Sequence, residues 1–378
     1  MKIQVKDSKS IFQSSVQISN GLRETSADGA CLAFDRKYGI MFCSYMPGGH
    51  GAYGESRNRV RLAYFPATQP TNIRYVDIAE GHQEYCNNIL GLGDGKVRVF
   101  YEKDSMSEGD HTVCFKDYDF VADTLSDEKT MRFRDGDQET VYNLSTIFAY
   151  LEAHGYKNHT RLDTEQLIIG GCTFFRGEDG YTYGAAVSYL SEVILYRSAD
   201  DLETVEPFAI YPHPAQYEFD YKFVNGEIYA IFRTNRKEGS LHFTSSKDMG
   251  KTWTEPVMLE KSINCRPRML HYNGGILMAY NYLYTEAPPS KILNNNRTAI
   301  KLCMVNPENP NESEVLAELY NRREIVNISV AEIFGDVYLA YSTSEAPLEY
   351  INYFGPNIPV IHGKDAIRYV KLGNFMED

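Results

Sequence analysis

A chain of 378 residues with 43% hydrophobic and 24% charged residues has the composition of a globular protein. Its 51 acidic side chains outnumber its 38 lysines and arginines, which gives a net charge of −13. A nucleic-acid-binding surface needs clustered lysines and arginines, so the negative net charge argues against a nucleic-acid partner.

The N-terminal residues 1–7 contain no apolar signal core, and no segment reaches transmembrane length. We therefore expect a soluble cytoplasmic protein with no membrane partner, or a secreted one if a signal peptide has been removed. Seven scattered cysteines form no C-x-x-C pair, so we expect no metal site and no cofactor, and their odd number suits a reducing compartment. They are Cys31, Cys43, Cys86, Cys114, Cys172, Cys265 and Cys303.

One pattern recurs six times along the chain: an apolar strand, a tight turn with glycine, and a second apolar strand. Asn-Gly and Asp-Gly between apolar runs are strong signals for a β-hairpin, because the turn needs a positive φ. Successive turns lie roughly 46 to 61 residues apart, with one gap of 85, and a four-stranded propeller blade needs about that length. The pattern predicts an all-β, six-bladed β-propeller that forms one domain over residues 1–378. The turns are Tyr38-Gly39, Asp94-Gly95, Asp179-Gly180, Asn225-Gly226, Gly274-Gly275 and Gly335-Asp336.

The long gap between the second and third hairpins contains a different pattern. Within residues 138–157, Leu144, Ile147, Phe148 and Leu151 fall at helical spacing. This predicts an inserted helical segment and not a seventh blade, and we expect it to rim the face that carries the site.

After the fourth hairpin, Ser246, Asp248, Gly250, Thr252 and Trp253 follow one another as S-x-D-x-G-x-T-W. This segment resembles the Asp-box (BNR repeat) of the sialidase-like six-bladed propellers. Forty-eight residues earlier, a second segment repeats the same Ser, Asp and Thr register at Ser198, Asp200 and Thr204. By blade count the resemblance covers about 340 residues. It implies a structural role for both boxes, on the turn between third and fourth strands, away from the site.

The same resemblance implies a carbohydrate-active enzyme. Sialidases hold the substrate carboxylate with three arginines, and Arg233, 15 residues after Glu218, matches the second of these with its glutamate partner. Arg297 matches the third arginine, and Glu218 or Asp220 would act as general acid or base.

Two positions depart from the family pattern. Asp28 or Gly29 occupies the register of the first arginine. Asn327 aligns with the tyrosine nucleophile, and an asparagine side chain cannot perform that attack, which places the ordinary retaining mechanism in doubt.

Arg266 and Arg268 begin the fifth hairpin, and strand alternation places both on one side. They could clamp an anion or form outward salt bridges. Several arginines on the expected site face of an acidic chain indicate a negatively charged substrate.

A second group of residues suggests different chemistry. The glycine-rich segment 48–57 carries His50, Tyr53 and Arg57, and His82 and Tyr85 lie before the second hairpin. Together with Asp110 and His111 they resemble the His/Tyr/Arg sites of propeller-type uronate lyases, although His82 and His111 could equally be ordinary loop residues.

We therefore expect an exo-acting glycoside hydrolase that acts on an oligosaccharide or acidic sugar. The alternatives are a lyase of uronate oligosaccharides and a non-catalytic glycan-binding propeller. Candidate catalytic residues are Glu218, Asp220, His50, His82 and Tyr53, and candidate substrate-binding residues are Arg233, Arg266, Arg268, Arg297, Arg57, Tyr85 and Asn327.

Overall fold

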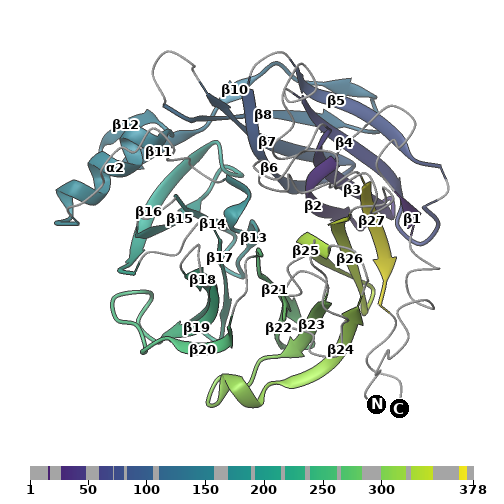
Figure 1. Ribbon diagram of the computed structural model, residues 1–378. Coiled ribbons are helices and arrows are strands. Elements are labelled where there is room, and N and C mark those ends of the chain that lie inside the picture. Colours follow the sequence, from purple (N-terminus) through teal and green to yellow (C-terminus); the bar gives the residue numbers. More distant parts are fainter. Residues whose placement is uncertain are drawn as a thin grey trace, which may run out of the picture.

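The computed structural model is a six-bladed β-propeller, with the blades arranged in chain order around a central axis (Figure 1). All six predicted hairpins form the two innermost strands of a blade, which confirms the expected fold. Among the described residues, no helix is long and apolar enough to cross a membrane. The structure describes residues 16–17, 27–47, 59–70, 72–80, 83–104, 110–156, 169–188, 192–213, 218–234, 239–261, 265–282, 299–320, 325–343 and 366–372.

Each blade is an antiparallel sheet that begins beside the axis and ends at the rim. Blades 1 and 2 comprise β2 (Ala27–Asp35), β3 (Ile40–Pro47), β4 (Arg59–Pro66), β5 (Arg74–Glu80), β6 (Gln83–Gly93), β7 (Lys96–Asp104), β8 (Thr112–Asp119), β9 (Thr124–Leu125) and β10 (Lys129–Thr130). Blades 3 and 4 comprise β13 (Phe175–Arg176), β14 (Thr182–Ala186), β15 (Val193–Ser198), β16 (Thr204–Tyr211), β17 (Phe219–Val224), β18 (Glu227–Thr234), β19 (Ser240–Ser246) and β20 (Val257–Lys261). Blades 5 and 6 comprise β21 (Arg268–Tyr272), β22 (Gly275–Asn281), β23 (Ala299–Met304), β24 (Glu314–Tyr320), β25 (Ile325–Ile333), β26 (Asp336–Thr343) and β27 (Ala366–Lys371), and η4 (Pro310–Glu312) precedes β24.

The ring closes through its two ends. Strand β1 (Val16–Gln17) pairs with β27, in the register Val16 to Tyr369, and becomes the outermost strand of blade 6. The N-terminal part of the chain thereby completes the last blade, and this stabilises a closed ring against opening between its first and last blades.

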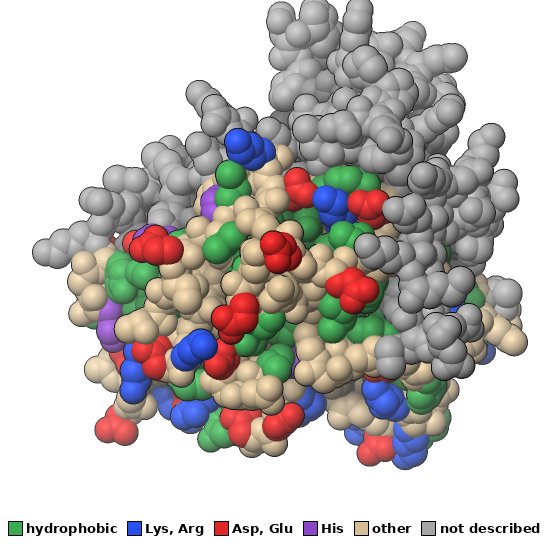
Figure 2. Space-filling model, turned by 90° about the horizontal axis from the view of Figure 1, so that it is seen from below, with side chains coloured by type: hydrophobic (Ala, Val, Ile, Leu, Met, Phe, Trp, Pro, Cys, Tyr) green, Lys and Arg blue, Asp and Glu red, His purple; other side chains and the backbone are tan. Residues whose placement is uncertain are grey.

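The hydrophobic core is divided among the blade interfaces. Six clusters of buried side chains are found in the described residues, and each combines residues of two consecutive blades. Trp253 packs on the cluster between blades 3 and 4, where its ring lies 5.0 Å from that of Tyr211. On the side of the ring shown in Figure 2, acidic and basic side chains are interspersed, as on an ordinary solvated surface.

Polar side chains on the inner strands link neighbouring blades around the axis. Asn87 Nδ2 of blade 2 donates to Gly29 O of blade 1 over 2.9 Å. Asn281 Nδ2 of blade 5 donates to Ile325 O of blade 6 over 2.8 Å. Ser329 Oγ of blade 6 accepts the backbone N–H of Leu32 in blade 1. Buried polar groups need such partners, so these bonds help to fix the angular position of each blade.

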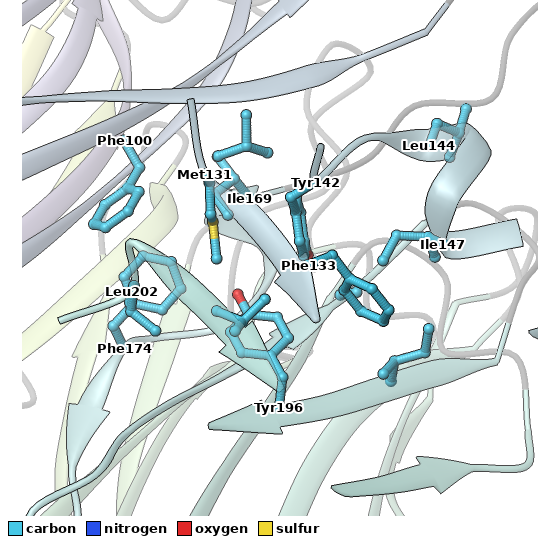
Figure 3. Packing of buried hydrophobic residues seen from close by; sticks show 14 of the residues in the cluster. Phe100, Met131, Phe133, Tyr142, Leu144, Ile147, Ile169, Phe174, Tyr196 and Leu202 are labelled. Carbon is cyan, nitrogen blue, oxygen red and sulfur yellow. The ribbon is translucent and has the colours of Figure 1, made fainter. Parts of the chain in front are cut away.

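The inserted segment folds as a strand pair followed by a helix. Strands β11 (Arg132–Asp135) and β12 (Gln138–Val141) pair with each other, and β11 extends the sheet of blade 3 through β16. Helix α2 spans Leu144–Ala153, begins at the capping side chain of Asn143, and buries the four apolar residues predicted to form its inner face. These pack with Phe133, Tyr142 and Tyr196 in the cluster between blades 2 and 3 (Figure 3).

One expectation for this segment needs correction. The helix is shorter than the predicted 138–157, because residues 138–141 complete a strand pair. It lies at the outer edge of the ring beside blades 2 and 3 (Figure 1), where its apolar face is used in the interface between those blades.

The third blade also departs from the predicted pattern at its start. The expected strand from Gly171 to Phe174 is replaced by a short 3₁₀ helix, η2 (Ile169–Gly171), and β13 is only two residues long. Asn88 of blade 2 donates to the carbonyls of Ile169 and Cys172, and Arg268 of blade 5 donates to those of Gly170 and Gly171. Blades 2 and 5 face each other across a ring of six, so η2 lies in the central channel.

Gly170 is placed where a side chain would not fit. A Cβ atom there would lie 2.6 Å from Asn87 O and 3.0 Å from Arg266 Nη1. We expect Gly170→Ala to lower the free energy of unfolding by about 1–3 kcal/mol, measured by urea denaturation. In the control Gly91→Ala, the nearest atom to the added Cβ is 3.7 Å away, so a similar loss there would contradict the steric explanation.

Candidate functional site

The turns between third and fourth strands in blades 3 and 4 share one hydrogen-bond pattern. Ser246 Oγ donates to Asp248 Oδ1 and accepts the backbone N–H of Gly250, and Asp248 accepts the N–H of Thr252. Ser198, Asp200, Leu202 and Thr204 repeat these bonds in the preceding blade. Both turns lie on the face that also carries the inner hairpin turns, here called the turn face. The opposite face, where the second strands end, is called the site face.

Four blades place a buried polar side chain at the same position, near the site face. It lies seven residues after the turn glycine: Glu102 in blade 2, Arg233 in blade 4, Asn281 in blade 5 and Ser342 in blade 6. All four lie on second strands, and none is more than 4% exposed. The repeat therefore builds a partial ring of buried polar groups, in four of the six blades.

Glu218 and Arg233 form an ion pair on this ring. Arg233 Nε lies 3.1 Å from Glu218 Oε2, and the backbone N–H of Arg233 donates to Glu218 O. The side chains are only 12% and 5% exposed, so the pair is far less screened than a surface salt bridge. The structure thus brings together Glu218 and Arg233, the two residues that the resemblance to sialidases paired.

Arg266 and Arg268 both turn inward, toward η2. Arg268 donates to the carbonyls of Pro267, Gly170 and Gly171, and Arg266 approaches Gly170. Burial, followed by the nearby Arg266 charge, lowers the pKa of Arg268. Two guanidinium groups this close and this buried make the local potential positive, which favours an anionic group at the site face.

Glu102 was not among the predicted catalytic or substrate-binding residues, although its position seven residues after Gly95 matches that of Arg233. Its carboxylate is fully buried and accepts the backbone N–H of Ile169 in η2. Its Oε2 lies 3.9 Å from Nδ1 of His111, which is also buried. Burial raises the pKa of Glu102 to about 8, although the Ile169 N–H and the Arg266 charge oppose the increase. The carboxyl group therefore retains a proton at neutral pH.

This raised pKa predicts a pH-dependent stability. Between the ordinary pKa of 4.5 and about 8, the folded protein holds a proton that the unfolded chain has released. The stabilisation that this proton confers is complete below pH 4.5 and is lost as the pH rises through 8. Between these two values the free energy of unfolding falls by about 1.4 kcal/mol per pH unit. We expect Glu102→Gln to remove this slope from urea-unfolding free energies measured at pH 5 to 8.

The control for this slope is Glu314→Gln, which changes an exposed carboxylate on β24. It should preserve the wild-type slope. Equal slopes in the Glu102→Gln variant and the wild type would show that Glu102 is not the group that titrates.

Asp220 has a different position from that expected of a general acid or base. It is fully buried and accepts bonds from Thr173 of blade 3 and from Met269 N of blade 5. Lys222 Nζ, also buried, lies 3.1 Å from Asp220 Oδ1. Both carboxylate oxygens thus accept hydrogen bonds that join blades 3, 4 and 5. We therefore assign Asp220 a structural function.

Asn327 lies in β25 at a bulge between Val326 and Ser329, with a φ of 49°. Asparagine adopts this left-handed conformation more readily than tyrosine does. Gly29, at the corresponding bulge of blade 1, has a φ of 72°. The residue that replaces the expected nucleophile therefore suits its backbone conformation.

The remaining predicted site residues cannot be placed. His50, Tyr53, Arg57, His82 and Arg297 lie outside the described residues, and Tyr85 lies in β6 with its side chain outside the described part. Within the ranges that the structure describes, no three histidine, cysteine or acidic side chains are grouped so as to hold a metal ion.

Comparisons with known proteins agree with this architecture. No protein-family model matches the chain, and no curated sequence is significantly similar to it. The phage phi92 endosialidase superposes with a TM-score of 0.58 at 10% identity, over 94% of this chain and 68% of that one. Trypanosoma rangeli sialidase in complex with sialic acid gives a TM-score of 0.53 at 10% identity, over 95% of this chain.

A mutant of the T. rangeli enzyme that displays trans-sialidase activity is similar at a TM-score of 0.55 and 9% identity, over 92% of this chain and 54% of that one. The chain thus spans about half the length of these T. rangeli proteins. At such low identity, the likeness shows a shared six-bladed fold.

Proposed function

We propose that this protein is a glycoside hydrolase that acts on a sugar bearing a carboxylate. The observation that carries the proposal is the buried pair of Glu218 and Arg233 at the site face. A glutamate held beside a guanidinium at the site face suits a general base or a group that stabilises an oxocarbenium-like transition state. The proposal is supported by the fold shared with sialidases of known structure.

The substrate class follows from the charges at the site face. Arg233 and Arg266 would bind the carboxylate, since a planar guanidinium matches it in a bidentate manner, and Arg297 would be a third partner. Glu102, which keeps its proton at neutral pH, would keep the site from acquiring a second full negative charge near Arg266.

The experiment is incubation with sialosides and uronate-capped oligosaccharides, in which released reducing sugar and the ultraviolet absorbance of a new C=C bond are followed together. Reducing ends without absorbance would support the hydrolase. New absorbance would instead show a lyase, and would direct attention to His50, Tyr53 and His82.

A glycan-binding propeller without turnover is the second candidate. Asn327, in the register of the tyrosine nucleophile, favours it, because the amide cannot form the covalent intermediate. Saturable binding of a sialoside with neither product would support this candidate against the hydrolase.

A further inference from the structure

A cavity of about 620 Å³ opens on the turn face, at the end of the channel opposite the proposed hydrolytic site. It is lined by the inner hairpin turns of blades 3 to 6, and its volume is typical of small-molecule sites. None of the described residues assigned to glycan binding above contributes to its wall. The lining residues that bear on its chemistry are Glu178, Asp179, Phe223, Asn225, His271 and Asn273.

The base of the cavity is aromatic and held by its own packing. Phe175 stacks on Tyr183 with the ring centroids 5.4 Å apart and the planes 19° from parallel. The Phe223 ring centroid lies 4.7 Å from that of Tyr183. Phe175 and Tyr183 are nearly buried, so this base offers an ordered apolar surface to a ligand.

The charged groups of the wall are mainly acidic. Arg176 is paired with Asp201 at 2.6 Å, and Glu332 is paired with Arg36 at 2.8 Å, so these two wall charges are balanced. Two further carboxylates, Glu178 and Asp179, are exposed.

In the part of the chain that the structure describes, no lysine or arginine lies within ion-pair distance of Glu178 or Asp179. Lys222, whose Nζ lies 4.4 Å from the centroid of the Phe175 ring, has its charge balanced by Asp220. The cavity wall therefore retains an excess of negative charge.

His271 adds another hydrogen-bond acceptor. Its Nε2 lies 2.6 Å from Phe223 O, so this nitrogen carries the hydrogen and donates it to the carbonyl. Partial desolvation lowers the pKa of His271, and in the neutral ring Nδ1 holds a lone pair. The imidazole Nδ1 and the Glu178 carboxylate thus favour a ligand that donates hydrogen bonds. Asp179 adds negative charge, although its two oxygens already accept the N–H of Tyr181 and the hydroxyl of Tyr183.

We propose that this cavity is a second ligand site, which binds a compact cation such as an amidinium, guanidinium or ammonium group on a flat apolar body. The apolar body would lie on the aromatic base formed by Phe175 and Phe223. The cationic group would donate to Glu178, Asp179 and His271. Among the described residues, the wall of this cavity shares no side chain with the proposed hydrolytic site, so we expect its occupation not to depend on glycan binding.

The test uses benzamidine and benzamide, which have the same shape but differ in charge. Both are titrated against the full chain, with saturation-transfer NMR and calorimetry as readouts. For a ligand of this size we expect benzamidine to bind with a Kd of about 1 mM, and benzamide at least about fivefold more weakly. Equal binding of the two compounds, or no binding of benzamidine tenfold above the expected Kd, would overturn the proposal.

Variants of Glu178 locate the binding. Its side chain is exposed, so Glu178→Gln and Glu178→Lys should fold normally. We expect the first to weaken benzamidine binding about fivefold and the second to abolish it. Glu312→Gln, an exposed change on the rim of blade 5, should have no effect. Binding that survives both Glu178 substitutions would be located elsewhere and would refute the site.

Discussion

Replacement of Asp220 with alanine is expected to lower the free energy of unfolding by about 3–5 kcal/mol, because it leaves the buried ammonium of Lys222 without its carboxylate. The same change removes the acceptor for Thr173 Oγ1 and for the backbone N–H of Met269. Urea denaturation, followed by far-ultraviolet circular dichroism, measures the loss.

Two further variants isolate the cause. Asp336→Ala removes a carboxylate from a more exposed pair with Lys371, and we expect a cost below about 1 kcal/mol. The double variant Asp220→Ala/Lys222→Met removes both buried charges, so it should be more stable than Asp220→Ala alone. If Lys222→Met brought no recovery, the cost would come from the lost inter-blade hydrogen bonds and not from the stranded charge.

Local turn chemistry made most of the fold predictable. Each glycine turn predicts a hairpin from neighbouring residues alone, and the helical spacing of Leu144, Ile147, Phe148 and Leu151 identifies side chains that are all buried. The closing strand β1 could not be predicted in this way. It is two residues long, and its partner β27 lies some 350 residues away along the chain.

The site was less predictable, because its geometry depends on contacts between distant segments. The first strand of blade 3 is shortened to two residues and is preceded by η2, whose carbonyls accept bonds from Asn88 and Arg268, more than 80 residues away in either direction. Asp220 looked available for catalysis because nothing nearby in sequence shows that blades 3 and 5 use both its oxygens. Glu102 could have been found by its register, since the seventh residue after the turn glycine is polar and buried in four blades.

Glu218→Gln is expected to reduce glycan turnover by about 10²- to 10⁴-fold while substrate affinity changes little. The amide keeps the shape of the carboxylate and places its oxygen at the same distance from Arg233 Nε, so we expect the guanidinium to keep its orientation. Unlike the carboxylate, the amide cannot take up a proton or stabilise positive charge in the transition state. The measurement is kcat and KM on whichever sialoside or uronate-capped substrate the wild type cleaves.

The matched control is Glu260→Gln. Glu260 lies in β20 of the same blade, is also largely buried, and is also ion-paired, with Lys301 Nζ 2.9 Å from its Oε1, but it lies on an outer strand away from the axis. The two substitutions remove the same charge from similar surroundings, so a loss of stability common to both cannot explain a difference in turnover. A decrease in kcat in the Glu218 variant alone would assign the chemistry to the site face, whereas equal activity of both variants and the wild type would exclude Glu218 from the reaction.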